Sequence, residues 1–149
     1  SPSTSKADDA HVTPAEAAHR YVTSYLAKDW DGLQSQMAER IRTRGLLPQF
    51  VQESLGRDGA VQLMSGWLDD DDEVVEVRRF EVEPLGYKEG VELQYLADSA
   101  GSRYLVEHHI FIQVDGDGLI EKFDMVCSGW LPLDEGDADG IRVRGVAVP

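Results

Sequence analysis

The segment at residues 106–127, VEHHIFIQVDGDGLIEKFDMVC, holds side chains that could carry out acid–base chemistry. It contains the adjacent histidines His108 and His109, the carboxylates Glu121 and Asp124, and the only cysteine of the chain, Cys127. An imidazole can donate, accept or transfer a proton near neutral pH, and a carboxylate can act beside it as a partner or as a second acid or base. Which of these groups can act together depends on the face of the local structure that each one occupies.

The Asp-Gly-Asp-Gly turn at residues 115–118 predicts a β-hairpin within this segment. If Val114 pairs with Leu119, one set of side chains shares a face, because alternate residues of a strand point the same way. The predicted pairs on that face are Ile112 with Glu121, Ile110 with Phe123, His108 with Met125, and Val106 with Cys127. The face is almost entirely apolar, so we expect it to face the core and to carry His108 inside.

The same alternation places His109 on the opposite face, beside Asp124. Two interpretations of each histidine remain open. His108 is either a neutral core imidazole, satisfied by a backbone carbonyl or a tyrosine, or the polar group of a ligand pocket. His109 and Asp124 form either a half-exposed charge pair or subunit contact, or a working dyad, although no nucleophile is evident beside them.

Other side chains have similar pairs of interpretations. Tyr21 and Tyr25 lie on a predicted helix, where each hydroxyl either completes the core packing or binds a ligand. Trp67 either packs in the core or contacts a flat apolar ligand, and Glu121 is either a solvated rim carboxylate or an acid or base at the cavity edge. Cys127 is expected to be a small buried hydrophobic side chain, since no basic partner is placed to lower its pKa.

No cofactor or metal site is predicted. The acidic run at residues 69–73 lacks the alternating spacing and the distal glutamate of a calcium-binding loop, and the four histidines lack metal-ligand spacing. The glycine-rich turn at 115–118 joins two strands and does not open a helix, so it is not a phosphate-binding loop.

These residues must be positioned by helices in the first half of the chain and strands in the second. Helical spacing of apolar residues predicts helices within 15–29, 29–41 and 56–68; Thr13 and Glu16 form a capping box at the start of the first, with Pro14 at its first helical position. Residues 42–55 are expected to be irregular. Period-two alternation predicts strands within 74–87, 90–98, 102–114 and 118–130. This order predicts an α+β fold, with three helices covering a curved antiparallel sheet of four to six strands.

The length of 149 residues fits one domain, which we place at residues 14–133. Residues 1–13 predict a disordered N-terminal arm, and residues 134–149 a Gly- and Asp-rich tail or a short edge strand. The net charge of −14 disfavours nucleic acids and anionic membrane surfaces as partners, and no apolar run is long enough to span a bilayer. A single cysteine excludes an intramolecular disulfide and fits a cytoplasmic protein.

The stretch RYVTSYLAKDWDGL at residues 20–33 and the stretch GRDGAVQLMSGWL at 56–68 resemble the nuclear transport factor 2-like fold. This family of cone-shaped α+β proteins includes ketosteroid isomerases, SnoaL-like polyketide cyclases and limonene-epoxide hydrolases. The resemblance covers residues 14–130. It implies that Tyr21 matches the isomerase tyrosine that donates a hydrogen bond to a substrate oxygen. The position of the isomerase base falls near Gly45, and that of its acid partner near Ile110, so steroid isomerisation is not expected.

The active-site residues of the family's cyclases and hydrolases are not matched in this sequence either. The positions that hold a histidine and an aspartate in many cyclases hold Phe123 and Met125 here, and the hydrolase arginine and paired aspartates are not reproduced in VEHHIFI. The resemblance therefore implies the family's cone, lined mainly by apolar side chains, more than any one of its reactions.

Two hypotheses on function follow. In the first, the cone binds a hydrophobic, polyketide-type molecule as a cyclase, isomerase or dehydratase. His108 and Tyr21 polarise an oxygen, Glu121 carries a proton, and the remaining lining is Tyr25, Trp67, Ile110, Phe123, Met125 and Cys127. In the second, the chain is a non-catalytic ligand-binding or dimerisation module. Its homodimer forms through the back of the sheet, where Phe111, Ile120 and Val126 are expected among charged residues.

Overall fold

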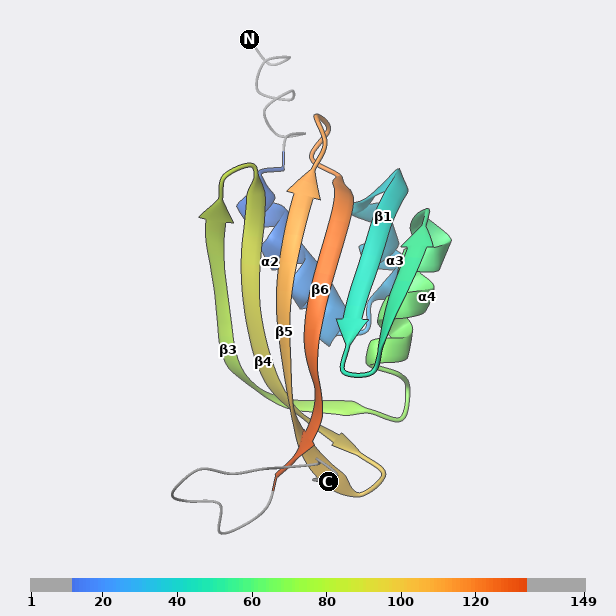
Figure 1. Cartoon of the computed structure of the whole chain (residues 1–149), viewed down its shortest axis with the longest axis vertical. Helices are drawn as coiled ribbons and strands as arrows, with labels where there is room; N and C mark the ends of the chain where they lie inside the picture. Colours follow the sequence, from blue (N-terminus) through green and yellow to red (C-terminus); the bar gives the residue numbers. More distant parts are fainter. Residues whose placement is uncertain (1–11, 134–149) are drawn as a thin grey trace.

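The computed structural model describes residues 12–133 (Figure 1). Residues 1–11 of the predicted arm and the whole predicted tail at 134–149 lie outside the described residues. The helices are α2 (Pro14–Leu26), α3 (Trp30–Ser35) and α4 (Arg57–Trp67). The strands are β1 (Met37–Leu47), β2 (Phe50–Leu55), β3 (Glu73–Leu85), β4 (Lys88–Ser99), β5 (Ser102–Val114) and β6 (Ile120–Pro132).

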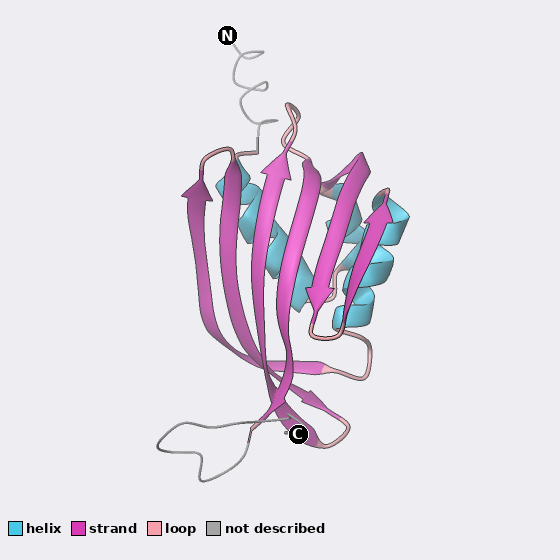
Figure 2. Ribbon diagram, viewed as in Figure 1, coloured by secondary structure: helices cyan, strands magenta, loops and turns pink. Residues whose placement is uncertain are grey.

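The six strands form one sheet in the order β2-β1-β6-β5-β4-β3 (Figure 2). Strands β1 and β6 are parallel, and every other neighbouring pair is antiparallel. The helices lie on one face of the sheet, with α2 over β3, β4 and β5 and α4 over β1 and β2 (Figure 1). This arrangement confirms the predicted α+β fold, with three helices on a curved sheet of four to six strands. The sheet is mixed and not purely antiparallel as predicted, because β1 runs parallel to β6. No helix among the described residues is both long and apolar enough to cross a membrane.

The capping box at the start of α2 is confirmed. The Thr13 hydroxyl accepts a hydrogen bond from the Glu16 backbone N–H at 3.1 Å, and the Glu16 carboxylate accepts one from the Thr13 N–H at 3.1 Å. The helix buries Ala18, Tyr21 and Tyr25, which lie three and four residues apart on one face. The cap fixes where the helix begins, and the apolar stripe fixes which side meets the sheet.

The expectation of irregular structure at residues 42–55 is wrong, because this segment forms most of the β1–β2 hairpin. The buried residues of β1 in this segment are Thr43 and Gly45, a hydroxyl and a hydrogen in place of large apolar groups. Strand β2 lies at the edge of the sheet and has no fully buried residue. An apolar–polar alternation is therefore weak in both strands, although their backbones pair regularly.

The predicted register of the β5–β6 hairpin is shifted by two residues. His108 pairs with Cys127 and Ile110 with Met125, whereas Met125 and Phe123 were expected as their respective partners. A shift of two keeps each side chain on its predicted face, so His108 and Phe123 both point inward. The register changes again near the turn, between the pairs Gln113–Lys122 and Val114–Ile120.

This second change of register is a β-bulge, and it changes the face of the sheet on which two residues near the turn lie. Ile120 and Phe123 are both fully buried although they are three residues apart, so Ile120 lies in the core and not on the back of the sheet. Glu121 lies on the outer face, where its carboxylate accepts a hydrogen bond from the Gln113 side chain at 3.1 Å. The expected position of Glu121 at the edge of the interior is therefore wrong.

Candidate functional site

His108 lies on the inner face of β5, in a cage of aromatic rings. The centroid of its imidazole is 5.6 Å from the ring of Tyr25, 5.8 Å from that of Tyr95 and 6.1 Å from that of Trp67. The histidine has no exposed surface, and its predicted place inside the fold is correct. We call the cluster of buried side chains around His108, between α2, α4 and the inner face of the sheet, the interior site. Besides His108 it includes Tyr21, Tyr25, Trp67, Tyr95 and Phe123.

Both ring nitrogens of His108 are buried and have no hydrogen-bond partner among the described residues. Burial, together with the nearby charge of His109, lowers the pKa of His108 from 6.5 to about 3. The imidazole is therefore neutral near pH 7 and offers one N–H donor and one nitrogen acceptor. With so low a pKa it is a weak base, and its useful chemistry is hydrogen bonding.

Tyr21 and Tyr25 project from α2 into the same site but differ in their hydroxyls. The two rings stack at 5.6 Å, and the Tyr21 ring also packs on Phe123 at 4.7 Å. The Tyr25 hydroxyl hydrogen-bonds with that of Tyr95 at 3.1 Å, whereas the Tyr21 hydroxyl is buried without a partner. Burial raises the pKa of Tyr21 well above its ordinary value, so its hydroxyl remains a neutral donor and acceptor.

Tyr95 was missed in the sequence, although its signal was present. Val91, Leu93, Tyr95 and Ala97 alternate along β4 and are all buried, so the period-two pattern of this strand already placed the tyrosine inside.

Trp67 closes the side of the interior site next to β1. Its ring centroid lies 6.3 Å from that of Phe123, and its indole N–H donates to the Gln52 side-chain oxygen at 2.8 Å. A Cβ atom on Gly45 would lie 2.6 Å from Cζ2 of Trp67, so only a glycine allows the ring to rest on β1 in this way. Trp67 is therefore fixed by its packing and by a hydrogen bond.

The remaining predicted lining residues also face inward. Ile110, Phe123 and Met125 are almost completely buried, and Cys127 lies opposite His108 with 8% of its surface exposed. Burial raises the pKa of the Cys127 thiol, whose sulfur accepts the Gly129 backbone N–H at 3.3 Å. The thiol is therefore protonated beside a neutral imidazole, a pair that does not form a thiolate nucleophile.

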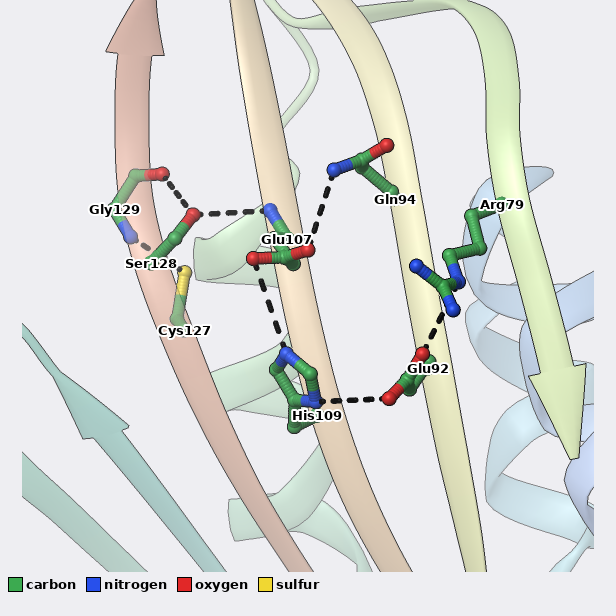
Figure 3. Close-up of polar contacts among 8 residues, drawn as sticks. All are labelled: Arg79, Glu92, Gln94, Glu107, His109, Cys127, Ser128 and Gly129. Atoms are coloured by element: carbon green, nitrogen blue, oxygen red, sulfur yellow. Dashed lines mark hydrogen bonds and ion pairs between the residues drawn. The ribbon is translucent and has the colours of Figure 1, made fainter. Parts of the chain in front are cut away.

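His109 lies on the outer face of the sheet (Figure 3). Across the β5–β6 ladder it pairs with Val126 and not with Asp124. Its imidazole is 4.0 Å from a carboxylate oxygen of Glu92 and 3.8 Å from one of Glu107. The two-residue shift of register places Val126 opposite His109. Asp124 instead accepts a hydrogen bond from the Arg44 guanidinium at 2.7 Å. The predicted pairing of His109 with Asp124 is therefore wrong, and a dyad of these two groups does not form.

The outer face also carries a hollow of about 460 Å³. Its lining includes Leu46, Val51, Phe111 and Val126, with Arg44 and Lys88 among the polar members. No group of three potential metal ligands occurs within residues 12–133. The outer face thus combines an apolar hollow with ion pairs, and the interior site combines aromatic packing with unpaired polar atoms.

Solved structures with this architecture include several enzymes and proteins named for enzymes. An epoxide hydrolase of Mycobacterium tuberculosis similar to limonene-epoxide hydrolase is 12% identical, with a TM-score of 0.59 over 76% of this chain and 81% of its own. A Catenulispora acidiphila protein with a ketosteroid isomerase-like fold is 12% identical, with a TM-score of 0.58 over 76% of this chain and 85% of its own. A Pseudomonas putida protein proposed to be a polyketide cyclase is 13% identical, with a TM-score of 0.60 over 76% and 90%.

These similarities confirm that the chain has the nuclear transport factor 2-like fold. At this level of identity they define the fold and not the reaction. No protein-family model matches the sequence, and no curated protein matches it.

Proposed function

We propose that the interior site binds a small hydrophobic molecule and that His108 and Tyr21 hydrogen-bond to its oxygen. The observation that carries the proposal is that the polar atoms of both side chains are buried and unpaired among the described residues. Leaving a buried polar group without a partner costs about 1–3 kcal/mol. A ligand oxygen placed between them would provide the missing partner and recover this free energy.

The chemistry available to such a complex is polarisation of an oxygen by neutral donors. The Tyr21 hydroxyl and one His108 N–H would both stabilise negative charge that develops on a carbonyl oxygen. The aromatic walls would hold a flexible substrate close to a reactive conformation, which suits a cyclase, isomerase or dehydratase of polyketide-type intermediates. Glu121 takes no part in this step because it lies on the outer face. The single cysteine also fits a reducing compartment such as the cytoplasm.

Ligand entry requires movement of the walls. The rings of Tyr21, Tyr25, Tyr95 and Phe123 have no exposed surface in the closed structure. A ligand would therefore bind a more open arrangement and shift the population towards it.

Native mass spectrometry of the purified protein tests this proposal. The wild-type protein is expected to retain a small molecule that the His108→Leu variant has lost. His109→Leu is a matched control, because it removes the neighbouring imidazole from the outer face, and it is expected to retain the molecule. If wild type and His108→Leu carry the same molecule in equal amounts, His108 does not bind it and the proposal fails.

A second candidate function, dimerisation through the back of the sheet, is supported by the exposed apolar groups around the outer hollow. Leu46, Val51 and Val126 are 47%, 58% and 40% exposed. The same face carries the ion pairs Arg44–Asp124 and Arg79–Glu92, which would supply the polar part of a two-fold interface around this apolar surface.

Light scattering separates this candidate from ligand binding. Val126→Asp is expected to convert a dimer into a monomer and to leave ligand retention unchanged, since Val126 points away from the interior site. Tyr87→Asp serves as the control, because Tyr87 is 74% exposed in the β3–β4 turn and outside the hollow. An unchanged mass for Val126→Asp would rule out this interface.

A further inference from the structure

Thr43 is a third polar residue in the interior with no hydrogen-bond partner. It lies on β1 between the inward positions of Ile41 and Gly45 and has no exposed surface. Its hydroxyl oxygen is buried and makes no hydrogen bond within residues 12–133. The sequence does not mark Thr43 as an inward residue, because residues 42–55 lack a clear alternation of apolar and polar side chains.

The position of Thr43 connects it to the interior site. It pairs across the β1–β6 ladder with Phe123, whose ring packs against Tyr21 at 4.7 Å. Trp67 rests on Gly45, the next inward residue of β1, and its ring centroid is 6.1 Å from that of His108. Thr43, Tyr21 and His108 therefore approach the same aromatic side chains from a strand, a helix and a second strand.

The hydroxyl of Thr43 makes no hydrogen bond that would explain its place in the strand. Its neighbour across the β1–β2 ladder, Ser54, also has a buried hydroxyl, and neither oxygen has a hydrogen-bond partner among the described residues. Valine has nearly the same shape, favours strands equally well and adds no buried polar atom. A buried hydroxyl without a partner destabilises the ligand-free protein, whereas the same hydroxyl is favourable once a ligand oxygen pairs with it.

The polar groups around Phe123 are also uncharged. His108 and Tyr21 are neutral near pH 7, and a threonine does not ionise. The one carboxylate among the buried polar residues belongs to Glu89, which pairs with Ile112, four residues from His108 along β5. At about 3.3 Å per residue, that pair is roughly 13 Å away along the strand. A charged ligand group in the interior site would therefore lack a counter-ion and would be costly to bury.

We propose that Thr43 is a binding residue of the interior site, and that the site takes an uncharged ligand with an apolar skeleton and at least two carbonyl or hydroxyl oxygens. One oxygen meets His108 and Tyr21, and another meets Thr43. This inference rests on the proposed function, since it assigns a further contact and a ligand class to the same site.

The test combines Thr43→Val with three probes that share a bicyclic skeleton: 6-hydroxy-1-tetralone, 1-tetralone and 2-naphthoate. Binding is measured by calorimetry and by the shift in melting temperature. Thr43→Val is expected to raise the melting temperature of the ligand-free protein by about 2–4 °C, because it removes an unpaired hydroxyl. It is expected to weaken binding of the two-oxygen probe by about tenfold, the equivalent of one hydrogen bond. Thr23→Val, at an exposed position of α2, is the matched control and should leave binding unchanged.

The outcomes separate this inference from the proposed function. Equal binding of 6-hydroxy-1-tetralone by wild type and Thr43→Val, with weaker binding by Tyr21→Phe and His108→Leu, would overturn the role of Thr43 and keep the site. If none of the three variants changes binding, the probe lies elsewhere and the proposed function fails as well. A lower melting temperature for ligand-free Thr43→Val would show that the hydroxyl is already paired. Equally tight binding of 2-naphthoate, or no binding of either neutral probe, would overturn the ligand class.

Discussion

Replacing His108 by leucine should remove a large part of the acid sensitivity of the protein. In the folded state the pKa of His108 is about 3, because the ring is buried, whereas in the unfolded chain the imidazole titrates near 6.5. The folded state therefore resists protonation that the unfolded state accepts. Below pH 6.5 protons bind preferentially to the unfolded chain, and stability falls until the folded state also becomes protonated near pH 3.

The size of the effect follows from the two pKa values. They differ by about 3.5, and each pKa unit is worth about 1.4 kcal/mol, so the full contribution is about 5 kcal/mol. At pH 4 the unfolded imidazole is about 2.5 pH units below its pKa, while the folded one is still mostly neutral. Wild type should therefore lose about 3 kcal/mol more than His108→Leu between pH 7 and pH 4, a large share of the stability of an ordinary domain.

Urea unfolding at pH 7, 5.5 and 4 measures the difference directly, since the carboxylates that also titrate in this range are common to both proteins. His109→Leu provides the comparison for loss of an imidazole from the outer face, where the side chain is 44% exposed. If wild type and His108→Leu lose stability in parallel, then water or an unseen partner reaches the imidazole. In that case the unpaired state of His108, on which the proposed function depends, would be wrong.

Three further predictions concern packing and helix capping. Gly45→Ala should destabilise the protein by about 1–3 kcal/mol in urea unfolding and change its tryptophan fluorescence, because the new methyl group would meet the Trp67 indole at 2.6 Å. Unchanged stability would show that the ring moves freely. Tyr25→Phe should cost about 1 kcal/mol by the same assay, since it breaks the hydrogen bond with Tyr95, and a stabilised variant would contradict that bond. Thr13→Ala should cost about 1 kcal/mol through loss of the α2 cap, and an unaltered melting temperature would show that the cap adds nothing.

The architecture could be predicted from the sequence because its strongest signals are local and periodic. The capping box marks the start of α2, and the alternation in β5 and β6 puts His108 and Phe123 on one face. The β1–β2 hairpin could not be predicted in this way. Its inward positions include Thr43 and Gly45, and Gly45 is explained only by Trp67, a contact from a different part of the chain.

Positions near the turn of the β5–β6 hairpin were harder to predict than those along its strands. A register shift of two residues keeps every side chain on its predicted face of the sheet but gives it a different cross-strand partner. The predicted inward position of His108 is therefore correct, and the predicted partner of His109 is wrong. The bulge that moves Glu121 to the outer face has no signal in the alternation, because one extra residue in β6 does not interrupt the apolar–polar pattern of the sequence. Local errors of this kind therefore changed the predicted chemistry without changing the predicted fold.

Three of the buried unpaired groups, those of Tyr21, Thr43 and His108, come from separate elements, which limits how they can be satisfied. Tyr21 is carried by α2, Thr43 by β1 and His108 by β5, and β6 lies between the two strands. A change of register in one strand cannot bring the three groups together. Each is fixed by the hydrogen bonds of its own strand or helix, and aromatic rings fill the interior around them. Side chains such as Tyr25 and Tyr95, which do lie in direct reach, have already paired with each other. A group that satisfies the remaining three has to sit among them and replace part of the aromatic packing, which is what an oxygen-bearing apolar ligand would do.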